Sequence, residues 1–360
     1  MNSRFSRRDF IKLSGLGLGA VALGSKGSPL ARPFWQGDFP QSERLGRVVD
    51  ELGTLINVRS APSSDAPEAG QLAGDEVVPW LREVVGYTPY RNQRWVETPQ
   101  GYVWAPLLQP VKNLPNTPLT ELPLNGADPG MWMEVTVPYV EAQLVNPVPL
   151  GFRTKFLVEN RLPIRFYYGQ VWWVDEIRNT ESRVEYRVRE LYGSRGDQFW
   201  VPAAAFKPIY PEDAAPLSPE VENKQIVVNI ARQTLSCYEG EREVYFCRVS
   251  TGRFGEETET PITDFSSVFM KYLSIHMEGG RAGGGYDLAG IGWVTFIVTG
   301  GIAVHSTYWH NNFGERTSAG CVNARPEDAK FVYRWSMPIV PYFPGKLEAV
   351  AGSPVRVVVS

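Results

Sequence analysis

Cysteine and histidine are scarce in this chain of 360 residues, which contains three of each. An odd cysteine count leaves at least one thiol that cannot pair within the chain. The net charge is only -3, with neither a basic surplus nor an acidic tail, and this argues against nucleic-acid binding. Beyond the N-terminal segment, no apolar run is long enough to span a bilayer.

Aromatic and turn-forming residues are abundant by contrast. The chain contains 11 Trp, 16 Tyr, 34 Gly and 29 Pro, and 43% of its residues are hydrophobic. That balance is ordinary for a chain that buries a core, and its length allows two or three domains. The aromatic, Gly-rich and Pro-rich composition predicts a mostly β, multidomain protein with many turns.

The first residues read as an export signal. "SRRDFIK" (Ser6 to Lys12) precedes a short apolar run, Leu13 to Gly24. The pair Arg7–Arg8 with Phe10 resembles the twin-arginine signal, whose cargo crosses the membrane already folded. We therefore expect residues 1–28 to engage the export machinery and to deliver the protein to the cell wall or periplasm, tethered if the signal is not cleaved. A chance basic N-terminus or an uncleaved anchor is the alternative.

Residues 42–113 carry short strands broken by turns. "LINVRSAPSSDAPEAGQLAGDEVV" begins at Leu55, and "RWVETPQGYVWAPL" begins at Arg94 and places two aromatic strands around a Pro-Gln-Gly turn. The order Asn-Val-Arg, Gly-Asp, Trp-Val and Gly-x-x-Trp resembles a bacterial SH3-like domain. The resemblance implies a small β-barrel that binds cell-wall peptides. The alternative is that the aromatics simply fill the barrel.

Residues 130–212 form a second β-rich segment. "VEYRVRELYGSRGDQFWVPAAAFKPI", from Val184 to Ile209, repeats the order of a strand, a Gly-rich turn and an aromatic strand with a Pro-bounded exit. We interpret it as a second SH3-like module, with a β-extension of the next domain as the alternative. The polar, Pro-rich stretch from Tyr210 to Lys224 is predicted to be a linker.

The last part, residues 223–360, begins with alternating apolar residues and a hairpin signal at Glu239-Gly240. Further strands are predicted at Trp293–Val298, Ile302–Ser306 and Pro354–Val359. The one short helix is predicted at Arg325–Ser336, with Pro326 near its first turn and acidic residues behind it.

The hairpin signal also predicts the fate of two cysteines. A two-residue turn at Glu239-Gly240 pairs Tyr238 with Glu241. Cys237 and Cys247 are then offset by five residues, about 16 Å at the strand rise and too far for a disulfide. We therefore predict three free thiols, with Cys321 alone reactive.

"AVHSTYWHNNFGERTSAGCVNARPEDA" (Ala303 to Ala329) concentrates the scarce residues, namely His305, His310 and Cys321. A thiol near neutral pH is mostly protonated, and it needs a base within hydrogen-bonding reach to act as a nucleophile. His305 ends a predicted strand. Cys321 follows small residues and directly precedes the predicted helix, whose N-terminus favours negative charge. This arrangement suits acyl transfer through a thioester.

The same segment resembles the signature of the L,D-transpeptidases, the family with a YkuD-type catalytic domain. The matching residues are His305-Ser306-Thr307 and then Ser318-Ala319-Gly320-Cys321-Val322-Asn323. Supporting blocks are "VSTG" at Val249, "TPIT" at Thr260 and the stretch from Tyr286 to Ser306. The resemblance covers residues 223–360 and implies a β-sandwich-like catalytic fold with a short helix after the cysteine. The chain departs from the pattern at Ala319, where the family has a second histidine.

The resemblance implies a role for each matching residue. Cys321 attacks the third residue of a stem tetrapeptide and expels the terminal D-Ala, His305 acts as the base, Ser306 orients the imidazole, and backbone N–H groups around Gly320 and Cys321 hold the oxyanion. Substrate-binding residues would be Asn323, Ser318, Tyr286 and Trp293. No cofactor or metal is implied. The expected partners are peptidoglycan stem peptides, with carbapenem-type β-lactams as covalent inhibitors.

Other interpretations are open at this stage. Cys321 and His305 would be structural if isolated, and His305, His310 and Cys321 would make an incomplete zinc site. His276 is predicted to be a surface or turn residue, and Gly279–Gly285 a flap over the site. A carboxypeptidase or endopeptidase with the same nucleophile, or a weakly active wall-binding protein, is the functional alternative.

Overall fold

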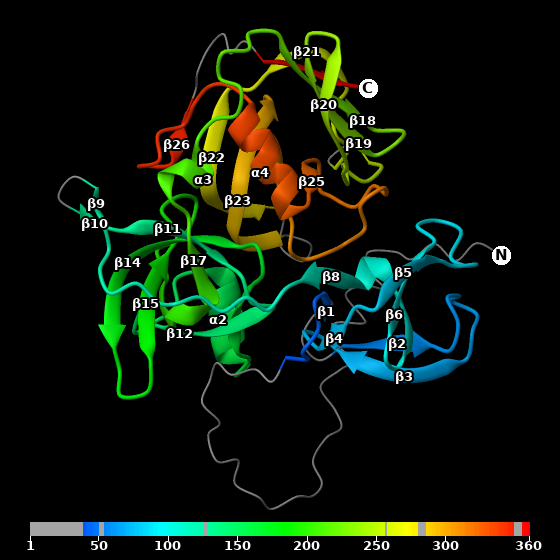
Figure 1. Ribbon diagram of the computed structural model, residues 1–360, viewed down its shortest axis with the longest axis horizontal. Coiled ribbons are helices and arrows are strands. Elements are labelled where there is room, and N and C mark those ends of the chain that lie inside the picture. The colour runs from blue at the N-terminus through cyan, green and yellow to red at the C-terminus, as the bar shows by residue number, and fades with distance from the viewer. Residues whose placement is uncertain (1–38, 50–53, 126–127, 256–257, 280–285, 349–354) are drawn as a thin grey trace, which may run out of the picture.

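The computed structural model describes residues 39–49, 54–125, 128–255, 258–279, 286–348 and 355–360. These residues form a mostly β structure of several sheets, as predicted, with two β modules ahead of a C-terminal domain (Figure 1). The predicted export signal lies outside the described residues, and so do residues 280–285 of the predicted flap. Within the described part, no helix is long and apolar enough to cross a membrane.

The first module consists of two small sheets that enclose one core. A three-stranded sheet has the order β4-β1-β8, and a five-stranded sheet has the order β3-β2-β7-β6-β5. The strands are β1 (Leu45–Val48), β2 (Leu55–Arg59), β3 (Glu68–Ala73), β4 (Val77–Pro79), β5 (Arg82–Val85), β6 (Arg94–Thr98), β7 (Gly101–Trp104) and β8 (Leu108–Val111). Val58, Trp80, Val96 and Leu108 are buried between the sheets. The turn between β6 and β7 needs Gly101, whose φ is 137° and whose Cβ would lie 2.5 Å from the Arg59 carbonyl oxygen.

The second module is a single seven-stranded sheet in the order β13-β12-β16-β15-β14-β11-β17. Its elements are β11 (Met131–Val135), β12 (Tyr139–Leu144), α2 (Phe152–Glu159), β13 (Ile164–Tyr167), β14 (Val171–Asn179), β15 (Val184–Arg189), β16 (Gln198–Pro202) and β17 (Phe206–Pro208), preceded by the hairpin β9 (Leu124–Asn125) and β10 (Asp128–Pro129). The sheet has a core of its own. Trp132, Val171, Trp173 and Ile209 nevertheless pack in the core of the C-terminal domain, so the two parts share an apolar interface.

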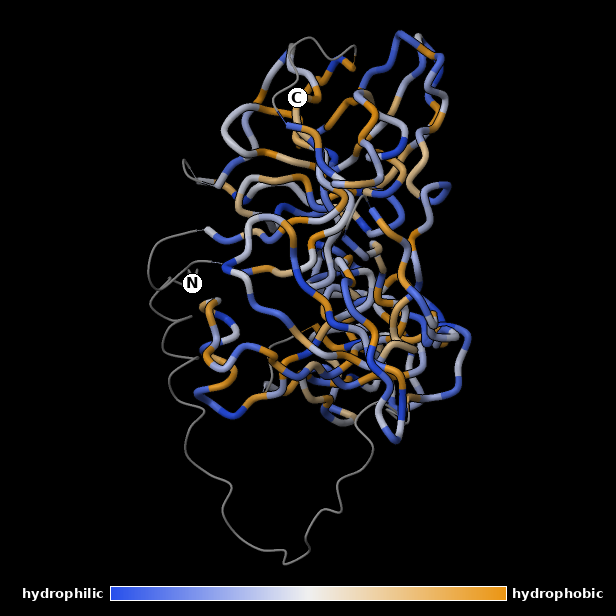
Figure 2. Tube along the Cα trace, turned by 90° about the vertical axis from the view of Figure 1, so that its left-hand side faces the viewer, coloured by the Kyte–Doolittle hydropathy of each residue, from blue (hydrophilic) through white to orange (hydrophobic). Residues whose placement is uncertain are grey.

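The C-terminal domain contains two five-stranded sheets, in the orders β20-β19-β18-β27-β21 and β25-β24-β23-β22-β26. Its elements are α3 (Pro211–Ala214), β18 (Lys224–Asn229), β19 (Thr234–Glu239), β20 (Arg242–Arg248), β21 (Thr263–Ser267), β22 (Met270–Gly279), β23 (Tyr286–Val298), β24 (Ile302–Ser306), β25 (Val322–Ala324), α4 (Pro326–Trp335), β26 (Lys346–Leu347) and β27 (Arg356–Val359). Figure 2 shows polar residues at the outer turns and apolar stretches along the strands between them.

The predicted helix is confirmed as α4, which begins at Pro326 and ends at Trp335. Its buried face, which includes Ala329 and Val332, packs against β23 and β24 (Figure 1). Two buried lysines satisfy carbonyl groups at and just after its C-terminal end: Lys224 Nζ donates to the Trp335 oxygen at 2.7 Å, and Lys271 Nζ donates to the Ser336 oxygen at 2.7 Å. Burial lowers the pKa of Lys271 to about 7.

The hairpin of β19 and β20 turns one residue later than predicted. Glu239 pairs with Arg242, and a bulge between Cys237 and Tyr238 shifts the rest, so that Cys237 faces Tyr245 and Leu235 faces Cys247. The predicted register was therefore wrong, and the two cysteines are offset by two residues, about 7 Å along the strand, instead of five. The conclusion about pairing is confirmed, because all three cysteines are free.

Candidate active site

The histidine and the cysteine of the motif lie on neighbouring parallel segments, with His305 in β24 and Cys321 directly before β25. In the register of β24 and β25, Val304 pairs with Val322 and His305 pairs with Asn323. Val304 and Val322 face the core beneath α4, whereas Ala303 and Cys321 face the opposite cluster. Because side chains alternate along a strand, His305 shares the face of Ala303 and Cys321. The imidazole and the thiol therefore open onto the same side of the sheet.

The orientation of the imidazole is fixed by the backbone. His305 Nδ1 lies 2.9 Å from the carbonyl oxygen of Ser306, and a carbonyl only accepts, so Nδ1 carries the proton. Nε2 is then unprotonated and available as a base. Burial lowers the pKa of His305 to about 4, although the Ser306 carbonyl acts against that shift. The Ser306 hydroxyl does not orient the ring; it accepts a hydrogen bond from Gly292 N at 3.0 Å.

Cys321 presents a neutral thiol in the resting site. Its Sγ lies 3.6 Å from the carbonyl oxygen of Gly301, which can accept the S–H proton. Burial raises the pKa of the thiol, and a hydrogen bond from the Ala303 backbone opposes that shift. With the pKa of His305 lowered and that of the Cys321 thiol raised, burial favours the neutral form of both groups.

The helix follows the cysteine as predicted, but the expectation that its N-terminus directly adjoins Cys321 was wrong. β25 (Val322–Ala324) lies between Cys321 and α4, whose first residue is Pro326. The helix N-terminus therefore does not adjoin the thiol, and its dipole is not the main source of anion stabilisation, since that effect falls off within the first turn. The backbone of the preceding turn is the remaining source.

That turn is shaped by hydroxyl groups. Ser318 Oγ donates to the Cys321 carbonyl at 2.5 Å and accepts from Gly320 N at 3.1 Å. Gly320 has a φ of 130°, which favours glycine. Its carbonyl accepts from Thr260 Oγ1 at 2.7 Å. Since the C=O and N–H of one trans peptide point in opposite directions, Thr260 turns the Cys321 N–H away from itself. Sequence reasoning noted the block at Thr260 but not this role.

The predicted substrate-binding residues separate into three groups. Tyr286 is partly exposed and close enough to Cys321 for a thiolate there to raise the pKa of the phenol, although burial is the larger cause of that shift. Ser318 and Asn323 are buried beside the site and support its backbone. The prediction that Trp293 binds substrate was wrong. Its ring is fully buried, packs edge-on against Tyr333 and belongs to the domain core.

His310 and Trp309 complete the surroundings of His305. The Trp309 ring stacks on His305 with ring centroids 5.9 Å apart, a contact that sequence reasoning did not anticipate. His310 Nε2 lies 2.9 Å from the Asn323 amide nitrogen, and Nδ1 accepts from Asn312 N at 3.1 Å. Both nitrogens of His310 are engaged, so the ring holds the loop and does not replace the missing histidine. Nor do His305, His310 and Cys321 form a zinc cluster within the described residues.

Ala319, which stands where the family has its second histidine, is exposed. We expect Ala319→His to raise the acylation rate of Cys321 about ten- to a hundredfold, a modest share of an acid–base contribution, because the open position accommodates the ring. Stopped-flow acylation by a chromogenic β-lactam measures this rate. Ala319→Gln is the matched control, with a polar side chain that does not titrate. An unchanged rate in Ala319→His would contradict the expectation.

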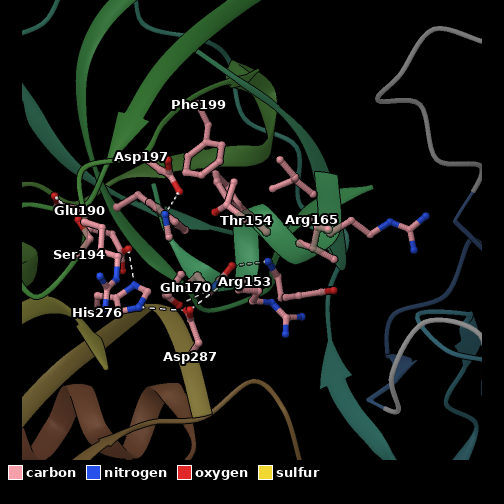
Figure 3. A pocket seen from close by; sticks show the side chains of 18 of the residues that line it. Arg153, Thr154, Arg165, Gln170, Glu190, Ser194, Asp197, Phe199, His276 and Asp287 are labelled. Carbon is pink, nitrogen blue, oxygen red and sulfur yellow. Dashed lines mark hydrogen bonds and ion pairs between the residues drawn. The ribbon is translucent and has the colours of Figure 1, made fainter. Parts of the chain in front are cut away.

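A second cluster, of titratable side chains, lies near the loop end of the β22–β23 hairpin. His276 is predominantly buried, contrary to the prediction of a surface residue; its Nδ1 lies 2.8 Å from Glu190 and its Nε2 lies 3.1 Å from Asp287 (Figure 3). Burial opposes protonation, but the hydrogen bonds to Asp287 and Glu190 outweigh it and raise the pKa of His276 to about 10. An imidazolium held between two carboxylates joins the second module to the C-terminal domain, beside a cavity of about 50 Å³ that has room for a few waters.

Comparison with known proteins finds a family match in the C-terminal part of the chain. Residues 223–357 match the YkuD family model, the L,D-transpeptidase catalytic domain. No curated protein matches the chain.

Three solved structures illustrate the similarity. An L,D-transpeptidase from Mycobacterium smegmatis is 16% identical over 52% of this chain and 98% of its own, with a TM-score of 0.31. A cysteine-to-serine mutant of the Enterococcus faecium enzyme is 19% identical over 39% and 51%, with a TM-score of 0.30. L,D-transpeptidase 3 from Mycobacterium tuberculosis, in complex with a faropenem-derived adduct, is 18% identical over 52% and 97%, with a TM-score of 0.30.

Proposed function

We propose that the YkuD L,D-transpeptidase catalytic domain at residues 223–357 makes this protein an exported acyltransferase, which cross-links or remodels peptidoglycan stem peptides through a thioester at Cys321. The observation that carries the proposal is the placement of a thiol and an imidazole on one face of adjacent segments, with an imidazole tautomer that leaves Nε2 unprotonated. That pair matches the chemical need of acyl transfer, in which a base takes a proton and later returns it.

The reaction proceeds in two halves. Nε2 of His305 takes the Cys321 proton as the sulfur attacks the carbonyl carbon of the third stem residue. The tetrahedral intermediate collapses as His305 returns that proton to the leaving D-Ala amine, which leaves a thioester. An acceptor amine then attacks the thioester carbonyl and gives a proton to His305, and the departing thiolate regains it. The products are a new amide bond and the free thiol.

The oxyanion is held by the turn before β25. Gly320 N already donates to Ser318 Oγ, so it is not available as predicted. The Cys321 N–H, directed by the bond between Thr260 and the Gly320 carbonyl, is the donor that we assign to the oxyanion. The Ala303 N–H, which already meets Cys321 Sγ, supports the developing thiolate.

A defined stem tetrapeptide with an amine acceptor tests the reaction. The account predicts a cross-linked product and released D-Ala in equal amounts, detected by mass spectrometry. D-Ala without a cross-link would identify a carboxypeptidase with the same nucleophile. Carbapenems are proposed to trap the enzyme at the thioester. Their lactam nitrogen leaves the carbonyl carbon but stays attached to the same molecule, so no fragment is released.

A role in wall binding is the second candidate function. Tyr87 and Tyr90, next to β5 of the first module, are 75% and 86% exposed, and such aromatics present stacking surfaces to sugars or peptides. We expect the full-length Tyr87→Ser/Tyr90→Ser protein to co-sediment with purified sacculi several-fold less than the unaltered protein. Val85→Ser, which removes an exposed aliphatic side chain nearby, is the control. Equal sedimentation of all three proteins would leave the module without this role.

A further inference from the structure

The chain between His305 and Cys321 is held by the first module, which is more than two hundred residues earlier in the sequence. In Figure 1 the orange loop beside β25 extends toward β8. Arg47 Nη2, on β1, donates to the Tyr308 carbonyl at 2.6 Å. Asn311 N and Nδ2 donate to the carbonyls of Pro106 and Ala105 at 3.2 and 3.1 Å. The active-site loop therefore obtains hydrogen-bond partners from a different module.

Arg47 is a buried ion at the centre of this contact. Its side chain is 3% exposed, and so is that of Asp75, whose Oδ1 it meets at 2.6 Å. Gln109 Oε1 accepts from Arg47 Nη2 at 2.8 Å, and the guanidinium lies 4.1 Å from the centre of the Tyr167 ring. A buried charge is costly unless it is paired and hydrogen-bonded, and the Tyr308 carbonyl is one of the acceptors that satisfy the Arg47 guanidinium, beside Asp75 and Gln109.

Two ring contacts connect Tyr308, which accepts the hydrogen bond from Arg47, to the His305 imidazole. Tyr308 stacks on Tyr167 at 5.5 Å, and it is followed directly by Trp309, which meets it edge-on at 5.0 Å. Trp309 in turn stacks on His305. A shift of the Tyr308 backbone therefore displaces the aromatic ring that covers one side of the imidazole.

A second attachment lies at the rim of the same interface. Asn92 Nδ2 donates to Asn312 Oδ1 at 2.7 Å. The Asn312 backbone N–H in turn donates to His310, and His310 contacts Asn323 on β25. Both strands of the catalytic pair are thus connected to the first module.

We propose that Arg47 is a positioning residue for the active site: through Tyr308 and Trp309 it holds the His305 imidazole in line for proton transfer from Cys321. This inference rests on the proposed function for the identity of the substrate. The alkylation rate of Cys321, described below, tests it independently of that function. A displacement of about 1 Å at a reacting pair costs on the order of a hundredfold in rate. The first module is then part of the catalytic unit.

The decisive comparison uses three full-length variants. Arg47→Met removes the charge and the hydrogen bond to Tyr308. Arg47→Lys keeps a charge beside Asp75, but it lacks the planar fork that meets Asp75, Gln109 and Tyr308 together. Arg165→Met is the matched control, because Arg165 meets the other oxygen of Asp75 at 3.1 Å from the second module, and its remaining ion pair is with Glu141.

Two rates are measured on protein whose unfolding midpoint lies well above the assay temperature: acylation by a carbapenem and alkylation of Cys321 by iodoacetamide, located by peptide mapping. Arg47→Met is expected to lower both rates about ten- to a hundredfold near pH 7, with the carbapenem concentration at half-saturation unchanged within about threefold. Arg47→Lys is expected to fall in between, and Arg165→Met to stay within about threefold.

Rates within threefold of the unaltered protein in Arg47→Met would overturn the proposal, and so would an equal loss in Arg165→Met. If Arg47→Met does not fold, Arg47→Lys and Asn92→Gly decide, because both keep a cation at position 47 beside Asp75. Asn92 has a φ of 47°, which glycine tolerates, and a loss of about three- to tenfold is expected there. A protein that alkylates at Cys321 but never acylates would refute the proposed function, while the alkylation ratios would still test the role of Arg47.

Discussion

Cys321→Ala is expected to form no acyl-enzyme and no cross-linked product, with a loss of roughly a million-fold in rate, the scale seen when the nucleophile of a catalytic triad is removed. The substitution deletes one sulfur atom from a partly exposed position, so the fold should be retained. Release of D-Ala from a stem tetrapeptide, followed by mass spectrometry, measures the effect.

Cys247→Ala serves as the control for this variant. Cys247, like Cys321, is a free thiol. Cys247 is buried in the core of the C-terminal domain, however, and burial raises its pKa. Its removal is expected to lower the unfolding temperature and to leave acylation intact in the folded protein. Substantial turnover in Cys321→Ala would refute the mechanism.

His305→Gln is expected to lower the acylation rate by several orders of magnitude, the scale of removing a base from a nucleophile–base pair. The amide of glutamine can still donate toward the Ser306 carbonyl, so the change removes the base with little change in shape. His310→Gln is the matched control: both ring nitrogens of His310 hold structure, and a loss of about tenfold or less is expected. Equal losses in the two variants would contradict the assignment of the base.

The pH dependence of the same reaction follows from the lowered pKa of His305, which is about 4 because of burial. The imidazole must be neutral to accept a proton, so its contribution is present above that pKa and is lost as the pH falls through it. Acylation by a carbapenem, which involves no acceptor amine, should therefore show its acid limb near pH 4 instead of near 6.5. A limb near 6.5 would indicate a solvated base.

Local patterns predicted the parts of the site that depend on neighbours in sequence. The strand Ile302–Ser306 was predicted with its observed limits, and the helix was predicted within one residue at each end, because alternation, Pro326 and acidic residues act locally. The mostly β class was also predictable from composition. These features reflect short-range preferences of the backbone.

Two of the errors share a physical cause, which is pairing between distant or weakly specified segments. β25 pairs with β24 across the whole loop, so the prediction missed the strand that separates Cys321 from the N-terminus of the helix. The β19–β20 register depends on a bulge that no residue pattern announces. Trp293 was assigned to substrate because aromatics serve both surfaces and cores, and only burial separates the two.

The contacts from the first module to the loop were invisible for the same reason. Arg47 and Asp75 are ordinary charged residues in the sequence, and Tyr308, whose carbonyl accepts from Arg47, is more than two hundred positions away. Thr260 likewise acts on Gly320 across sixty residues. Only the folded arrangement brings these groups together.

Intact-mass spectrometry of the full-length protein incubated with a carbapenem tests the central claim most directly, because the thiol opens the lactam ring and retains the whole molecule. The account predicts one adduct per chain, mapped to Cys321, that is absent in Cys321→Ala and forms far more slowly in His305→Gln. A protein that stays unmodified, or an adduct mapped to Cys237 or Cys247, would contradict it.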